Sequence, residues 1–218
     1  MVRPGFLDAA ACAAVLDGVA RWRAEHPLPL IHRSGPGRDL HYRVIDGEAF
    51  AAAVPGAGAL VARVRAELEA VWGAPLAPLD DARAACNVNI TPPGGEYRWH
   101  YDRNRATAIV YLNVVEGGET ELYPGYRAWL PGGRPAGAQA ALDRLAVTRA
   151  ARVTLGRRQV IAPAPGALVA LRGDRTLHSV RRVRGDHERV NLVLAFDEPG
   201  ASRRRPALDR YLYGPGQR

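Results

Sequence analysis

The chain of 218 residues contains no lysine, so all 30 of its basic residues are arginine. Against 22 acidic residues they give a formal net charge of +8. A basic balance can indicate a nucleic-acid or anionic-membrane partner. Here Ala, Arg, Gly and Pro are abundant together, which is typical of a GC-rich bacterial genome. We therefore interpret the charge as a solvated arginine-rich surface and do not expect a nucleic-acid partner.

Cysteines and long apolar runs are also scarce. Cys12 and Cys86 are too few for a disulfide framework and lack zinc-site spacing, so we expect buried free thiols. No apolar run approaches the roughly 20 residues that span a membrane. The first residues lack the apolar core of a signal peptide, so we expect a cytoplasmic protein without membrane contact. The composition fits one globular domain over residues 1–218.

Residues 1–80 show mainly helical periodicity. Asp8 can cap a helix whose apolar residues recur at three- and four-residue steps up to Trp22. A second helical pattern over 60–72 stops at Gly73, and residues 41–45 between the two patterns predict a short strand. We expect these N-terminal helices to pack on the outer face of one sheet.

From about residue 84 the apolar period changes to two, which predicts a mainly β structure. Gly117-Gly118 and residues 172–175 are interpreted as tight hairpin turns. About eight short strands in succession favour a sandwich, barrel or jelly roll. The predicted strands are 84–90, 97–102, 107–114, 119–123, 159–162, 167–172, 176–180 and 189–196.

Residues 125–156 interrupt the strands with a Gly/Pro/Ala-rich insertion and a possible helix over 137–147. Such a long β–β connection is often a lid or binding element. A surface excursion without a role is an equal alternative.

His100 and Asp102 lie two residues apart at the end of a predicted strand, so both side chains should point to the same side. His178 lies on a later strand. Two imidazoles and one carboxylate on one face of a metal leave the opposite face open, as in non-heme Fe(II) oxygenases. An H-x-D pattern arises readily by chance, and a strand histidine is often a core residue. The metal-site hypothesis therefore depends on its context.

Arg189 begins a predicted strand on which Asn191, Val193 and Ala195 share its face. An inward-pointing guanidinium needs an anionic partner. The arginine fork matches a carboxylate, and a dicarboxylate co-substrate bound to the metal would supply one. A surface arginine at a strand start is the alternative.

Several sequence pieces occur in the order typical of a known family. They span about residues 84–197 and resemble the prolyl-hydroxylase-like 2-oxoglutarate/Fe(II) oxygenases. The pieces are YRWHYD (97–102), IVYLN (109–113), GGET (117–120), PAPGALV (163–169), LHSV (177–180) and Arg189. No single piece is decisive, but the ordered set is specific.

The resemblance implies a double-stranded β-helix, a cupin-like jelly roll, over residues 84–197. It implies that Fe(II) is bound by His100, Asp102 and His178 and that Arg189 pairs with the distal carboxylate of 2-oxoglutarate. It also implies O2 as co-substrate and hydroxylation of a C–H bond in a small molecule, amino acid or peptidyl substrate, with release of succinate and CO2.

Further residues are assigned by the same resemblance. The hydroxyl of Tyr111 would add to the contact with the distal carboxylate. Near the metal-proximal carboxylate the family often has a tyrosine or asparagine; the candidates here are Asn89 and Thr91, and Thr91 departs from the tyrosine. Asp102 is not a small residue, which favours oxygen transfer over halogenation.

Substrate contacts are expected from Arg103 and Arg105 near the barrel mouth and from Arg127 and Trp129 in the insertion, a mix suited to an anionic or planar substrate. Two alternatives stay open. A nucleic-acid repair oxygenase of the same superfamily is favoured by the basic charge and by the spacing from Asn89 to His100. A non-catalytic cupin-type metal or ligand binder would not need Arg189.

Overall fold

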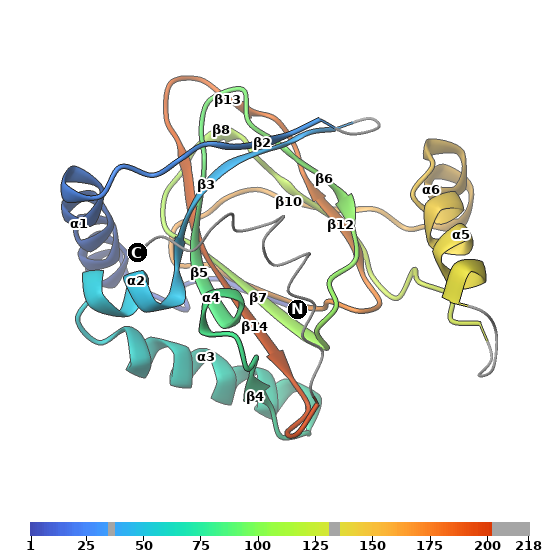
Figure 1. Ribbon diagram of the computed structural model, residues 1–218, viewed down its shortest axis with the longest axis horizontal. Helices are drawn as coiled ribbons and strands as arrows, with labels where there is room; N and C mark the ends of the chain where they lie inside the picture. The colour runs from blue at the N-terminus through green and yellow to red at the C-terminus, as the bar shows by residue number, and fades with distance from the viewer. Residues whose placement is uncertain (35–37, 131–135, 202–218) are drawn as a thin grey trace.

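Two antiparallel β-sheets face each other at the centre of the protein (Figure 1). The computed structural model describes residues 1–34, 38–130 and 136–201. The larger sheet has the strand order β1-β11-β7-β14-β5-β3-β2, with β4 paired to β14. In that order its strands are Val2–Arg3, Leu168–Arg172, Ala106–Tyr111, Arg189–Asp197, Cys86–Thr91, Leu40–Asp46 and Ile31–Arg33, and β4 is Ala77–Pro78.

The smaller sheet has the order β10-β9-β12-β6, and a two-stranded ribbon pairs β8 with β13. Its strands are Gln159–Ile161 (β10), Thr120–Tyr123 (β9), Leu177–Val180 (β12) and Tyr97–His100 (β6); the ribbon is Glu116–Gly117 (β8) and Val183–Arg184 (β13). From β6 to β12 the chain passes repeatedly between the two sheets, as in the predicted jelly roll: β7 and β11 lie in the larger sheet, and β6, the β9–β10 pair and β12 lie in the smaller one.

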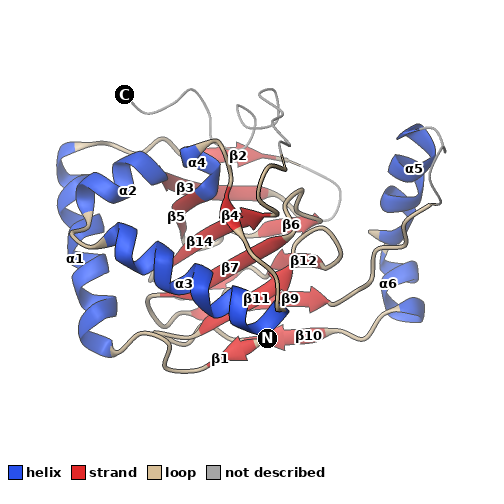
Figure 2. Cartoon of the chain, turned by 90° about the horizontal axis from the view of Figure 1, so that it is seen from below, coloured by secondary structure: helices blue, strands red, loops and turns tan. Residues whose placement is uncertain are grey.

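Helices α1 (Ala9–Glu25), α2 (Gly47–Ala53) and α3 (Ala57–Trp72) cover the outer face of the larger sheet, as Figure 2 shows. The side chain of Asp8 caps α1 by accepting from the amide of Ala11, and Gly73 ends α3 in the left-handed region. The expected helical support is confirmed. The helices and the sheet share one apolar core. The helices contribute Val15, Val19, Phe50, Val64 and Leu68, and the strands contribute Val88, Ile90, Val110, Leu192 and Leu194.

A second apolar cluster fills part of the space between the sheets, because strand residues alternate between faces. On β14 the expected alternation is confirmed: Val190 and Leu192 face the helices, whereas Arg189 and Asn191 line the interior cavity. The interior cluster comprises Ile109, Tyr111, Leu122, Ala167, Val169 and Leu171.

Two turns were predicted to be hairpins, and both predictions are wrong, because neither turn joins neighbouring strands of one sheet. Gly117 and Gly118 adopt positive φ angles of 73° and 63°, but Gly117 belongs to β8, which pairs with β13, and the next strand, β9, lies in the smaller sheet. Residues 172–175 form a turn closed by the amide of Arg175 on the carbonyl of Arg172, and it too joins different sheets. Both turns carry the chain across the barrel, since consecutive jelly-roll strands need not be neighbours.

Several predicted strand ends also differ. The strand predicted over 84–90 begins at Cys86, because a short helix α4 (Ala82–Ala85) precedes it. The strand predicted over 97–102 ends at His100, and that over 107–114 ends at Tyr111. Both cysteines are buried and free, as expected. No described helix has the length and apolarity of a membrane span.

The insertion forms helices α5 (Ala136–Ala146) and α6 (Arg149–Leu155), which stand beside the smaller sheet at the far right of Figures 1 and 2. The helix predicted over 137–147 corresponds to α5, and α6 was not predicted. Residues 131–135 of the insertion lie outside the described residues.

Candidate active site

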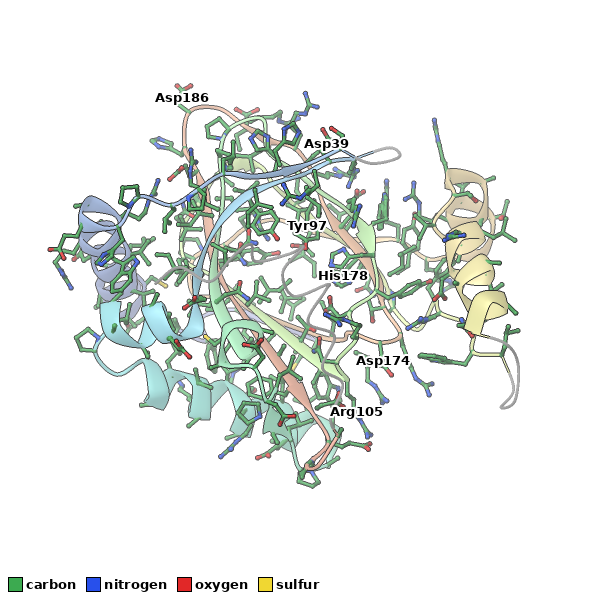
Figure 3. The ribbon with its side chains drawn as sticks, viewed as in Figure 1. Asp39, Tyr97, Arg105, Asp174, His178 and Asp186 are labelled. Carbon is green, nitrogen blue, oxygen red and sulfur yellow. The ribbon has the colours of Figure 1, made fainter. Side chains whose placement is uncertain are left out.

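His100, Asp102 and His178 meet between the two sheets. Each offers a ligand atom within 4.8 Å of the others. The Nε2 atoms of His100 and His178 lie 3.5 Å and 3.6 Å from Oδ1 of Asp102, and the two imidazole rings are 4.0 Å apart. Figure 3 shows His178 pointing into the barrel interior. The donor set and its spacing fit one divalent metal ion on a facial triad.

Hydrogen bonds to the main chain orient both imidazoles. Nδ1 of His100 lies 2.8 Å from the carbonyl of Arg98, and Nδ1 of His178 lies 3.0 Å from the carbonyl of Thr176. A carbonyl accepts only, so each Nδ1 donates and each Nε2 is left to face Oδ1 of Asp102. Such outer contacts are typical of metal-binding histidines.

The ionisation of the site also suits a metal. Burial, reinforced by the nearby His100, lowers the pKa of His178 to about 4, so this imidazole is neutral near pH 7. Burial by itself would raise the pKa of Asp102, but His178, His100 and the hydrogen bond from Thr107 hold that pKa well below its usual range. A neutral imidazole and a carboxylate are the forms that bind metal.

Asp102 lies just beyond strand β6, and so its orientation does not come from strand alternation alone. Its amide donates to the carbonyl of Gly173, and its Oδ2 accepts from the Thr107 hydroxyl at 2.5 Å. Gly173 is needed because a Cβ there would come within 2.8 Å of the Cβ of Asp102. The crossing turn and β7 together direct Oδ1 towards the histidines.

Arg189 is buried deep in the barrel, with only 2% of its surface exposed. Its guanidinium donates to Asn191 and, at 3.1 Å, to the hydroxyl of Thr120, while its Nε has no partner among the described residues. Tyr111 is fully buried beside it and donates to Thr120 at 2.6 Å. Burial lowers the pKa of Arg189. A buried guanidinium whose protein partners are neutral calls for an anion, and a carboxylate fits its fork.

The Gly-Gly pair explains how the chain passes so close to Arg189. A Cβ on Gly118 would lie 2.9 Å from Cδ of Arg189, and the residue has a φ of 63°. Both the close approach and the left-handed backbone require glycine. This residue was not singled out as part of the site from the sequence.

One cavity of about 270 Å³ contains both the triad and Arg189. Asn89 lines it. Thr91 is buried next to Arg189 in the register and donates to Asn89 at 3.2 Å, without lining the cavity itself. Further lining residues include Tyr42, Asn87, Arg98, Tyr101, Arg103, Ile109, Val193, Ala195 and Asp197.

Sequence reasoning missed Tyr97 and Tyr42. The ring of Tyr97 lies 4.7 Å from that of His100 and 5.3 Å from that of Tyr42, and both tyrosines line the cavity. Tyr97 stands in the same strand as His100, which was a usable signal. Tyr42 reaches the site through the pairing of β3 with β5, which no local pattern predicts.

The four predicted substrate residues are not gathered in one place. Arg103 lines the cavity. Arg105 forms an ion pair with Glu198, and Figure 3 shows it at the lower edge of the barrel. Arg127 is paired with Asp143 at 2.5 Å and covers the ring of Trp129, which is 48% exposed; neither lines the cavity. The substrate roles of all four stay predictions.

Comparison with known proteins identifies the class. Residues 86–196 match the profile of the 2OG-Fe(II) oxygenase superfamily, about half of the chain. The chain belongs to this superfamily and is an Fe(II)/2-oxoglutarate-dependent dioxygenase. No curated protein sequence matches it.

Solved structures share the fold at low identity. The carbocyclase SnoK from nogalamycin biosynthesis has a TM-score of 0.72 at 15% identity, covering 100% of this chain and 86% of its own. A prolyl-4-hydroxylase from Pseudomonas putida has 0.59 at 19%, covering 92% of each. HygX from Streptomyces hygroscopicus, solved with nickel and 2-oxoglutarate, has 0.58 at 15%, covering 94% and 85%. They support the double-stranded β-helix.

Proposed function

We propose that the protein hydroxylates a C–H bond of a small molecule, amino acid or peptidyl residue, with Fe(II) held by His100, Asp102 and His178. The observation that carries this proposal is the single cavity lined both by that triad and by Arg189, which is buried and has no carboxylate partner among the described residues. A metal-chelating dicarboxylate would bridge the two ends. A protein that only binds a metal does not need a buried arginine in the same cavity as its metal ligands.

Different residues of the cavity would bind the two carboxylates of 2-oxoglutarate. Arg189 and Tyr111 would bind the distal carboxylate of 2-oxoglutarate, with Thr120 fixing both groups. Asn89, supported by Thr91, faces the cavity where it could contact the metal-proximal carboxylate. Iron held there would supply the chemistry that couples reduction of O2 to oxidation of 2-oxoglutarate and substrate, and the barrel walls would exclude water from the site.

The size of the cavity limits the substrate. About 270 Å³ lies just below the range typical of ligand pockets, about 300–1,000 Å³. Because 2-oxoglutarate would occupy the end near Arg189, the remaining space suits a compact molecule or a single side chain of a peptide. Arg103 on the wall would select a carboxylate or another anionic group on the substrate.

A lid role for residues 125–156 is part of the proposal, with Arg127 and Trp129 closing over substrate. It requires movement, since α5 and α6 stand beside the smaller sheet (Figure 1). Replacing the insertion with a short glycine-serine linker tests it. Loss of coupled hydroxylation with persisting substrate-free decarboxylation supports the lid; unaffected coupled turnover makes the insertion dispensable.

The deciding experiment measures succinate. The purified protein is incubated with Fe(II), 2-oxoglutarate, O2 and panels of amino acids, peptides and small acids, with anaerobic samples as the control. Substrate-stimulated succinate and a product heavier by one oxygen support the proposal. No succinate under any condition favours a non-catalytic binder, and stimulation by single-stranded DNA alone favours the nucleic-acid alternative.

A further inference from the structure

Four arginines gather on the outer face of the smaller sheet, opposite the face that carries the metal ligands. They come from separate segments: three of them pair with one carboxylate, Glu121 on β9, and the fourth lies over the ring of Trp99. We call this group, consisting of Arg38 before β3, Arg152 on α6, Arg158 before β10 and Arg181 after β12, the arginine cluster.

Glu121 is already saturated. Its side chain is 2% exposed; Oε1 pairs with Arg158 at 3.3 Å and Arg181 at 2.9 Å, and Oε2 pairs with Arg38 at 2.7 Å. The hydroxyl of Ser179 also donates to Oε2. A carboxylate has about four acceptor positions, so none is left for another guanidinium. Burial would raise the pKa of Glu121, but its hydrogen bonds from Arg181 and Arg38 hold that pKa below its usual range.

Arg152 is the member that Glu121 does not satisfy. Its guanidinium lies 4.2 Å from the centre of the Trp99 ring, and Arg38 lies 5.3 Å from the same ring. Nη1 of Arg152 is buried and has no hydrogen-bond partner among the described residues. A buried donor without an acceptor is costly, and the nearby positive charge of Arg38 adds repulsion.

The charges around the cluster do not balance. The described ion pairs of Arg38, Arg158 and Arg181 all lead to Glu121, and Glu119 adds its charge near Arg181. Among the described residues, the four guanidinium groups therefore face these two carboxylates. The surplus lies at the end formed by Arg38 and Arg152, where the unpaired donor is found.

We propose that the arginine cluster binds a phosphate-like oxyanion carrying two negative charges, held by Arg152 and Arg38 beside Trp99. Guanidinium forks match phosphate oxygens, and such an anion would supply both the missing acceptor and the missing charge. Three of the guanidiniums converge on Glu121 and the fourth lies beside them over Trp99, whereas a nucleic-acid backbone needs an extended track of contacts. A small anion is therefore the occupant that the cluster fits, and the site is independent of the proposed hydroxylation.

Phosphate binding is measured by calorimetry and by thermal unfolding, in sodium phosphate against sodium chloride at equal ionic strength. The proteins are the full wild-type chain, Arg152→Gln, Arg38→Gln and a control, Arg21→Gln, at an exposed position on α1. Wild type and control should bind phosphate, and each cluster variant should bind about tenfold or more weakly, as expected for loss of a charge-assisted hydrogen bond. Equal behaviour of wild type in phosphate and chloride overturns the proposal.

Glu121→Gln tests whether Glu121 competes with phosphate for the arginines of the cluster. Removing the competing carboxylate should lower stability in chloride but increase the stabilisation by phosphate, whereas a purely structural cluster would lose stability that phosphate does not restore. Glycerol phosphate, as a second probe, distinguishes two sources of the anion. An affinity equal to that for inorganic phosphate indicates free phosphate as the ligand, and a higher affinity indicates a phosphorylated molecule. Binding of a single-stranded oligonucleotide through Arg38 and Arg152 without phosphate binding would contradict the small-anion site.

Discussion

The hydroxyl of Thr107 donates to Oδ2 of Asp102 at 2.5 Å and thereby leaves Oδ1 to face both histidine Nε2 atoms. The Thr107 hydroxyl in turn accepts from the side-chain Nδ2 of Asn104 at 2.9 Å. This chain of hydrogen bonds fixes a carboxylate that no strand holds, so the geometry of the proposed metal site depends on a residue that does not itself bind metal.

Thr107→Val should weaken binding of Fe(II) or Mn(II) by about 10–100-fold, the usual effect of losing an outer contact to a metal ligand. Valine has the same shape but cannot donate, so Asp102 loses its orientation. Anaerobic calorimetry measures the affinity. Thr107→Ser keeps the hydroxyl and is the matched control; equal losses in both variants would point to packing as the cause.

Replacing any member of the triad, in His100→Ala, Asp102→Ala or His178→Ala, should reduce metal affinity by more than Thr107→Val does, because a ligand itself is lost. The fold should survive, since the helix-backed core is elsewhere. Metal titration and circular dichroism check both points. His32→Ala, at an exposed histidine outside the site, should bind metal normally. Wild-type affinity in a triad variant would remove that residue from the site.

Arg189→Leu should raise the KM for 2-oxoglutarate about tenfold or more while metal affinity changes little. The lost charge-assisted hydrogen bond is worth about 1.5–3 kcal/mol. Steady-state kinetics and metal titration separate the two effects. Arg98→Leu and Arg172→Leu are companion variants: if one of them raises KM and Arg189→Leu does not, the co-substrate carboxylate binds elsewhere.

Gly118→Ala should also raise the KM for 2-oxoglutarate, because its new Cβ would push against Cδ of Arg189. Gly125→Ala is the matched control. Its φ of 64° gives a similar backbone cost, roughly 1 kcal/mol, but nothing lies within 4 Å of the new atom. Both variants should unfold at lower temperature, and only Gly118→Ala should change KM. The same KM in both variants would show that Arg189 tolerates the contact.

The sequence was sufficient for the interior face of β14 and for α1 and α3 on the larger sheet, because these follow from local periodicity, whereas the short helix α2 between them was not predicted. The convergence of His100, Asp102 and His178 was also anticipated, although Asp102 reaches the site through Thr107 and Gly173 and not through the strand alternation that the sequence suggested.

Other features depend on contacts between distant segments and leave no local pattern. Tyr42 enters the cavity only because β3 pairs with β5, and Gly117-Gly118 looks like a hairpin turn until the sheets are assigned. The partners of Arg105 and Arg127, Glu198 and Asp143, were likewise hidden. An arginine that the sequence suggests is available for substrate can be neutralised by an ion pair with a residue distant in the chain.

His100 and His178 are direct partners in the register of β6 and β12, and β6 is the last strand of its sheet. A terminal strand is paired on one side only and opens more readily than its inner neighbours. A metal ion held by both histidines would therefore act as a clip across the two strands. Its binding energy would oppose each opening event, so the amides of Tyr97–His100 would exchange with solvent deuterium more slowly as metal saturation rises.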